Sequence, residues 1–165
     1  MVLLKCYYHI SAILKLFVYR LIYGKSLKVG KRVTFRKGFS IMIEKGAYVE
    51  IGDGSFFNNY CSISAMGKIY IGKNCLFGES VKLYDHNHVF NRENVLIKNQ
   101  GYSVGKIKIE DNCWLGSDVI VTKNVTIGEN TVVAAGEIVR KDISKNMLYK
   151  SNCEEKLKYK ENNSV

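Results

Sequence analysis

The sequence predicts a mainly β fold, a parallel β-helix with one helix before it and one long protruding loop inside it. An apolar residue recurs every six positions through much of the chain, helical spacing of apolar residues is confined to the first 23 positions, and one polar stretch interrupts the repeat. A six-residue period with one obligatory apolar position is typical of parallel β-helices, in which each hexad forms a short strand and a corner. Three hexads then form one triangular coil.

The composition agrees with one folded domain. The chain has 165 residues, of which 47% are hydrophobic, and it has 14 glycines but no proline. These values exclude intrinsic disorder, a collagen-like repeat and a proline-rich linker.

The net charge of +10 is concentrated at the N-terminus. Residues 1–43 hold nine Lys or Arg and no acidic residue, residues 44–139 have a balance of −2, and residues 140–165 have a balance of +3. Proteins that bind nucleic acid more often spread basic and aromatic residues over the folded domain, so no nucleic acid is expected as a partner.

Residues 1–26 are predicted to form an amphipathic, basic N-terminal helix, with positions 2–23 helical and Gly24 as the stop. Spacings of three and four place the apolar residues on one stripe. The stripe contains Leu3, Cys6, Tyr7, Ile10, Ile13, Leu14, Phe17 and Leu21. Charged residues interrupt this stretch too often for a bilayer span, and no small-x-small cleavage site follows it.

Two interpretations of that helix remain open. The stripe packs on the body of the protein or on a sister subunit, or the helix makes a peripheral contact with an anionic membrane surface through residues 1–26.

Residues 27–143 are assigned to the β-helix, and residues 144–165 to a C-terminal tail. The clearest register is Ile109, Leu115, Val121, Ile127, Val133 and Val139. The same register appears as Ile71, Phe77 and Leu83, as Ile51, Phe57 and Ile63, and in degenerate form as Val33, Phe39 and Ile43. These side chains are expected to point inward and to stack on their counterparts one coil away.

The five cysteines are not expected to be catalytic. Cys61, Cys75 and Cys113 each fall four positions after a repeat residue, where a small buried side chain is expected. Their odd number and the absence of C-x-x-C spacing argue against a disulfide framework or a zinc ribbon and favour a reducing compartment. A cytoplasmic location is expected, peripheral on the inner face of the membrane if the helix binds lipid.

The repeat breaks once, at a polar loop over residues 84–106. This loop is too long for a corner, and long loops inside compact repeats are usually functional. It contains Asp85, His86, Asn87 and His88 in succession. A histidine oriented by a carboxylate can act as a general base near neutral pH. An incidental surface loop and a metal site are the alternatives, although a metal would need further ligands.

The chain resembles the hexapeptide-repeat acyltransferases, the left-handed parallel β-helix family, over about residues 27–153. The resemblance is carried by Asp85–His88, by Ile109–Ser117 with its Trp-Leu-Gly-Ser ending, and by Ile127–Ile143. It is closest to the O-acetyltransferases of sugars and of capsular and lipopolysaccharide glycans.

The resemblance implies a homotrimer with active sites in clefts between neighbouring β-helices. Acetyl-CoA is the implied co-substrate, no metal is expected, and a loop histidine deprotonates the acceptor hydroxyl, which attacks the thioester directly. A backbone N–H near the cleft would stabilise the oxyanion. His88 is preferred to His86 as the base because of its spacing from Asp85, which would orient the ring or preserve the loop.

The family also implies binding residues. Asn58 and Trp114 would contact the acceptor, although a polar corner and simple packing are comparable explanations for them. Gly116, Ser117, Ala135 and Gly136 match small positions along the pantetheine arm of CoA, and Arg140 and Lys141 fall near its phosphates. The chain lacks the prolines that the family typically has at the end of its β-helix. At the last small position, where the family usually has Ser or Thr, this chain has Glu137.

The leading hypothesis is therefore acetyl transfer from acetyl-CoA to a hydroxyl of a sugar or glycan. The alternatives are N-acetylation of an amino sugar, a serine-type O-acetyltransferase, a carbonic-anhydrase-like metal enzyme, and a non-catalytic trimeric scaffold. The family does not specify the acceptor.

Overall fold

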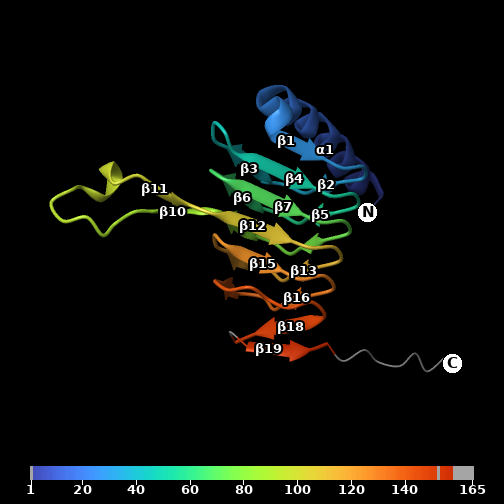
Figure 1. The fold of residues 1–165 in the computed structure, drawn as a ribbon. Helices are drawn as coiled ribbons and strands as arrows, with labels where there is room; N and C mark the ends of the chain where they lie inside the picture. Colours follow the sequence, from blue (N-terminus) through green and yellow to red (C-terminus); the bar gives the residue numbers. More distant parts are fainter. Residues whose placement is uncertain (1, 152, 158–165) are drawn as a thin grey trace.

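Three stacks of short parallel strands run the length of the molecule and form the faces of a triangular β-helix (Figure 1). The computed structural model describes residues 2–151 and 153–157, and for residues 2–6 it describes the backbone alone. The predicted fold class is confirmed, including the N-terminal helix and the protruding loop.

Each face collects one strand from each coil. The first face contains β1 (Leu27–Val29), β4 (Tyr48–Ile51), β7 (Lys68–Ile71), β12 (Lys106–Ile109) and β15 (Val125–Ile127). The second contains β2 (Thr34–Phe35), β5 (Phe56–Phe57), β8 (Leu76–Phe77), β13 (Trp114–Leu115), β16 (Val132–Val133), β18 (Met147–Lys150) and the antiparallel β19 (Cys153–Lys156). The third contains β3 (Ser40–Ile43), β6 (Ser62–Ala65), β9 (Lys82–Tyr84), β14 (Ile120–Val121) and β17 (Ile138–Val139).

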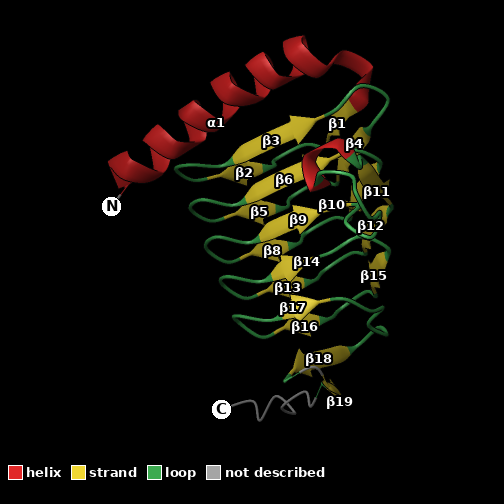
Figure 2. Ribbon diagram, turned by 90° about the vertical axis from the view of Figure 1, so that its left-hand side faces the viewer, coloured by secondary structure: helices red, strands yellow, loops and turns green. Residues whose placement is uncertain are grey.

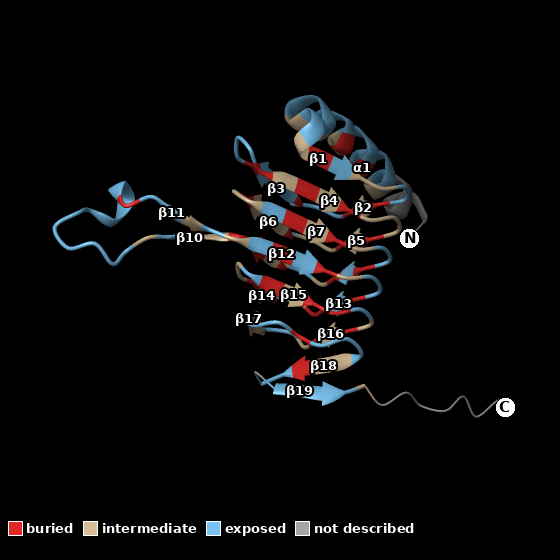
Figure 3. Cartoon of the chain, in the orientation of Figure 1, coloured by how far each residue is buried: buried red, intermediate tan, exposed pale blue. Residues whose placement is uncertain are grey.

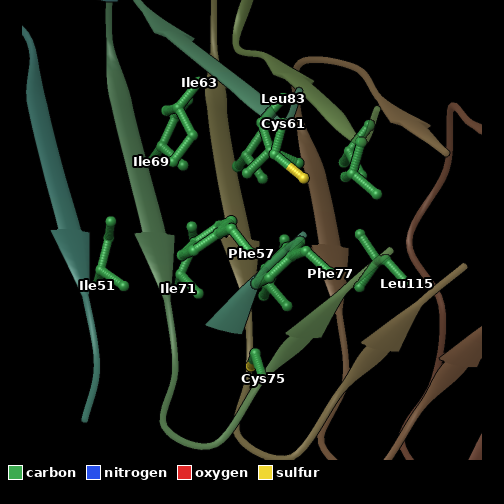
Figure 4. Close-up of a cluster of buried hydrophobic side chains, with 14 of the residues drawn as sticks. Ile51, Phe57, Cys61, Ile63, Ile69, Ile71, Cys75, Phe77, Leu83 and Leu115 are labelled. Carbon is green, nitrogen blue, oxygen red and sulfur yellow. The ribbon is translucent and has the colours of Figure 1, made fainter. Parts of the chain in front are cut away.

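The six-residue period predicts the core because it returns the same inward position on every strand. Ile109 pairs with Ile127, Leu115 with Val133, and Val121 with Val139, and all six side chains are buried. Figure 4 shows the same stacking in earlier coils, where the rings of Phe57 and Phe77 lie parallel with centroids 4.3 Å apart. Burying these columns of aliphatic and aromatic carbon is the main stabilisation of the fold.

The register of the first coil differs from the predicted one. The residues that pair with Ile51, Phe57 and Ile63 are Val29, Phe35 and Ile41. Val33 and Phe39 instead occupy the buried position four residues later, and Ile43 pairs with Ala65.

Extra residues at two corners interrupt the six-residue repeat, and the first of them shifts the register of the first coil. The prediction that the repeat breaks only once was therefore wrong. The step from Ile41 to Ile51 is ten positions and the step from Ile63 to Ile71 is eight, where a regular corner has six. Both insertions lie between the third and first faces, at the corner from which the long loop leaves in the next coil.

That long loop is an antiparallel hairpin. It consists of β10 (His86–His88), a tip with the 3₁₀ turn η2 (Ile97–Asn99), and β11 (Tyr102–Val104), and it projects sideways from the β-helix (Figure 1). Gln100 is buried and holds the tip, because its amide accepts from Arg92 N and donates to the Arg92 and Val95 carbonyls.

The chain continues the β-helix beyond residue 143, where the sequence predicted a tail. Strand β18 pairs in parallel with β16, Tyr149 of β18 is buried, and β19 then turns back along β18. This hairpin closes the C-terminal end of the core.

Helix α1 (Val2–Tyr23) caps the N-terminal end of the β-helix, followed by the 3₁₀ turn η1 (Gly24–Ser26) (Figure 2). The first coil has no preceding coil to donate N–H groups to its backbone carbonyls, which is a cost that repeat proteins meet with a capping element. Side chains of α1 supply the missing partners: the Tyr23 hydroxyl donates to Ile41 O at 2.9 Å and Arg20 Nη2 donates to Val29 O at 3.1 Å. Lys15 Nζ donates to Phe39 O.

The predicted apolar stripe of α1 therefore does not pack on the body of the same chain. The side of α1 that faces the first coil contains Ala12 and Leu16, which are buried, whereas the described members of the stripe are exposed. The side chains of Leu3 and Cys6 lie outside the described residues. None of the described helices is long and apolar enough to cross a membrane.

Candidate active site

Asp85 anchors the base of the hairpin. Its side chain is fully buried, and its two carboxylate oxygens accept the backbone N–H groups of Met66 and Gly67, each at 2.8 Å. Its own carbonyl accepts the N–H of Gly105 at 2.7 Å, on the returning strand. Three segments thus meet at one residue, and the corner insertion at positions 66 and 67 supplies two of the donors.

The same carboxylate orients His86. His86 Nδ1 lies 3.1 Å from Asp85 Oδ1, and the imidazole is half-buried against the edge of Tyr102, with ring centroids 5.7 Å apart. A carboxylate facing Nδ1 favours the proton on that nitrogen. Nε2 is then unprotonated and able to accept a proton, which is the arrangement that a general base requires.

His88 has a different environment. Its side chain is exposed, and its ring packs on Tyr102 with centroids 4.4 Å apart and an interplanar angle of 41°. The sequence preferred His88 because of its spacing from Asp85, but the carboxylate contacts His86 instead. A strand places alternate side chains on opposite faces, and His86 and His88 share a face on β10, so Tyr102 touches both.

A groove of about 530 Å³ runs along the second face, on the outer side of its strands. It collects five of the predicted binding residues, together with Gly78, Val132, Val133, Ala134 and Leu148. The five are Asn58, Trp114, Gly116, Ser117 and Ala135.

Trp114 forms the exposed wall of this groove. It lies on β13 between Leu76 and Val132, with 52% of its surface exposed. A residue so exposed contributes little core packing, and a flat apolar ring in a groove is suited to contact a ligand. Asn58 lies at the corner directly after β5, where its Oδ1 accepts from Arg36 Nη1 at 3.1 Å and from Asn59 N at 2.9 Å.

The glycines of the groove are explained by the fold itself. A Cβ at Gly116 would lie 2.6 Å from Ala135 N, and a Cβ at Gly78 would lie 2.5 Å from Ser117 N, because successive coils approach closely at this corner. Gly136 is not part of the groove lining, and its φ of +77° favours glycine. The backbone geometry therefore requires glycine at these positions, and the groove forms because no side chain fills the space beside them.

The remaining predicted residues lie elsewhere. Arg140 and Lys141 are exposed after β17 and are not part of the groove lining. The hairpin leaves the corner between the third and first faces, whereas the groove follows the second face and its corner with the third. Figure 2 shows β10 and β11 on the opposite side from the turns that follow β5 and β8. One chain therefore does not bring His86 and the groove together.

Sequence reasoning missed Tyr102, Met66 and Gly67. The sequence signal for Gly67 is the glycine itself, since a Cβ at this position would lie 2.3 Å from Gly105 O. That close approach could be recognised only after the structure had located the corner insertion. Among the described residues, no group of three or more His, Cys, Asp or Glu is placed to hold a metal ion.

The buried cysteines are poorly suited to act as nucleophiles. Cys61, Cys75 and Cys113 are buried, and Cys61 Sγ donates to Gly78 O at 3.0 Å. Burial raises the pKa of Cys61 to about 11, so the reactive thiolate is scarce at neutral pH.

Comparison with known proteins identifies the family. The family described as bacterial transferase hexapeptide (six repeats) matches residues 106–136. The structure is similar to a maltose O-acetyltransferase from Clostridium difficile 630, with a TM-score of 0.70 and 30% identity over 86% of this chain and 74% of that one. The chain belongs to the hexapeptide-repeat acetyltransferases.

Two further relatives are similar over shorter ranges. A hexapeptide-repeat acetyltransferase from Vibrio cholerae, solved with acetyl coenzyme A, has a TM-score of 0.65 and 28% identity, covering 78% of this chain and 67% of that one. The galactoside O-acetyltransferase of Escherichia coli is 36% identical over 103 residues, 62% of this chain and 50% of that protein. The alignments span about half the length of the curated relatives this chain matches first.

Proposed function

We propose that this protein transfers the acetyl group of acetyl-CoA to a hydroxyl of a sugar or glycan, with His86 as the general base. The observation that carries the proposal is the contact between Asp85 Oδ1 and His86 Nδ1, at the base of a hairpin held by a buried carboxylate. The relatives support the reaction class, since two are named sugar O-acetyltransferases and one was solved with acetyl coenzyme A.

In the proposed reaction, His86 Nε2 takes the proton of the acceptor hydroxyl as its oxygen attacks the thioester carbonyl carbon. The C–S bond breaks on collapse of the tetrahedral intermediate, and the imidazolium returns its proton to the leaving thiolate, so that free CoA and an acetyl ester are released. Asp85 keeps the ring oriented and stabilises its transient positive charge.

The groove beside Trp114 is the proposed binding cleft. Its lining of Ala, Val, Leu and Gly suits an apolar arm such as pantetheine, and the indole is available to the acceptor. Arg140 and Lys141 remain candidates for binding the CoA phosphates, since both are exposed cations in the C-terminal part of the β-helix.

A complete site requires a second copy of the chain, because the hairpin and the groove lie at different corners of one β-helix. We therefore include in the proposal a homotrimer in which the hairpin of one subunit reaches the groove of the next. The unpaired, buried cysteines agree with a reducing compartment, which favours the cytoplasm as the place of reaction.

The direct test is release of CoA thiol from acetyl-CoA with a panel of mono- and oligosaccharides, including amino sugars. Acceptor-dependent release with an acetyl ester as product supports the proposal. An amide product would indicate N-acetylation, and no release with any acceptor would favour a scaffold.

A further inference from the structure

The outer face of α1 is a continuous apolar surface directed away from the β-helix. The face consists of Tyr7, Ile10, Leu14, Phe17, Val18 and Leu21, which recur at three and four positions and so lie on one side of the helix. Five of them are at least 60% exposed: Tyr7, Ile10, Leu14, Phe17 and Leu21. Figure 3 shows most of the described part of α1 in the colour of exposed residues, at the end of the stacked coils.

No charged side chain belongs to this face among the described residues. The described cations of α1 point to the other side, where Lys15 donates to Phe39 O and Arg20 donates to Val29 O. These bonds direct the two cations to the first coil, and Ser11 and the stem of Lys15 border the apolar side chains of the outer face. A soluble monomer rarely exposes an apolar surface of this extent without a partner for it.

Basic residues surround the same end of the molecule. Lys25, Lys31, Arg32 and Lys37 are exposed on η1 and on the turns of the first coil, which lie directly beside α1. The sequence contains no acidic residue before Glu44. The N-terminal end thus combines an apolar helix face with an excess of positive charge, of which Lys28 is paired with Glu50.

We propose that the outer face of α1 docks on an anionic lipid surface. An apolar helix face with flanking cations fits the boundary between acyl chains and negatively charged headgroups. Two copies meeting through this face would instead bring two ends together that each expose Lys25, Lys31, Arg32 and Lys37, which like-charge repulsion disfavours. The bonds of Lys15, Arg20 and Tyr23 hold α1 across the end of the coil, so the helix lies along the surface.

Docking in this way stands the β-helix with its N-terminal end on the membrane. The hairpin projects sideways from the long axis (Figure 1), and the groove is lined by residues from Asn58 onward, beyond the first coil, so the lipid covers neither of them. The binding does not depend on the proposed acetyl transfer, and the two can fail separately.

The test is flotation of the full-length protein with vesicles of phosphatidylglycerol and of phosphatidylcholine. The protein is expected to float with phosphatidylglycerol, less so as salt is raised, because the cations are screened. The double variant Leu14→Ser with Leu21→Ser should lower the partition coefficient at least ~10-fold, since both side chains lose their apolar contact with lipid. The triple variant Lys25→Gln, Lys31→Gln and Lys37→Gln should lower it on the order of 10²-fold, at about fivefold per charge.

The matched control is Leu96→Ser with Ile97→Ser, which removes two equally exposed apolar side chains from the hairpin tip. It should float as the unchanged protein does. Equal flotation of the Leu14→Ser, Leu21→Ser variant and the unchanged protein would overturn the proposal. If that variant also lost oligomer mass while its flotation was unchanged, the face would be identified as a protein interface instead. Circular dichroism of each variant verifies that it folds.

Discussion

Asp85 Oδ1 lies 3.1 Å from His86 Nδ1, and the same carboxylate accepts two backbone N–H groups from a neighbouring corner. The residue that fixes the hairpin to the β-helix is therefore also the one that fixes the imidazole. Loop position and ring orientation are coupled through a single side chain.

Replacing each histidine tests which of them is the base. His86→Asn should lower kcat at least ~10²-fold, the lower range for loss of a general base, with the fold intact. His88→Asn should cost less, because its exposed ring is not oriented by Asp85. The measurement is the rate of CoA thiol release under saturating substrates. If only the His88 variant is impaired, the roles are reversed.

Asp85→Asn tests orientation separately from binding. We expect kcat to fall by at least ~10-fold while KM for acetyl-CoA changes little, because the ring loses its partner but the groove is untouched. The amide also leaves one N–H of Met66 or Gly67 without an acceptor, so the free energy of unfolding should fall by about 1–3 kcal/mol. A fall in stability with normal kcat would make Asp85 purely structural.

The six-residue period predicted the core because the geometry of a coil leaves little choice: every sixth residue must be apolar and must point inward. A matched pair of variants tests this. Val121→Asp should destabilise the fold by more than ~4 kcal/mol, since the carboxylate is buried without a partner. Ile120→Asp, on the outward face of the same strand, should fold. Urea unfolding distinguishes them, and equal loss in both would contradict the assigned register.

Two features escaped the sequence for physical reasons. The corner insertions beside Ile43 and Ala65 contain ordinary residues, so only the observed strand pairing locates them. The orientation of α1 was hidden because its inward side includes Tyr19 and Tyr23, which pack on the core through their rings and donate from their hydroxyls to carbonyls of the first coil. Hydrophobic periodicity assigns the more apolar side of a helix to the protein core, but in α1 the more apolar side faces outward.

The site was predictable in its parts but not in its assembly. The groove collects Asn58, Trp114, Gly116, Ser117 and Ala135 because they lie on the strands of the second face or within two residues after them, which the period reveals. The choice between His86 and His88 depends on a contact between adjacent residues at the start of a strand, and spacing alone gave the other preference.

Burial of Cys61 predicts a dependence of stability on high pH. Its pKa is raised by burial to about 11 in the folded protein, so the folded state retains a proton that the unfolded chain releases above its ordinary value near 9. The resulting stability is present below pH 9 and is lost as pH rises towards 11, with a total of about 2–3 kcal/mol. Urea unfolding from pH 8 to 11 should show a shallower decline in Cys61→Ala than in the unchanged protein. Parallel curves would contradict it.

Subunit mixing tests the shared site. His86→Asn lacks the base, and Ala135→Trp fills the groove at an exposed position, so each variant alone should be nearly inactive. If the hairpin of one subunit serves the groove of the next, unfolding and refolding the two together restores sites that combine an intact hairpin with an intact groove. In a cyclic trimer with random mixing at equal concentrations, about a quarter of the sites are of this kind. Recovery near that fraction of the unchanged activity supports the shared site, and a mixture as inactive as its components would place the whole site within one chain.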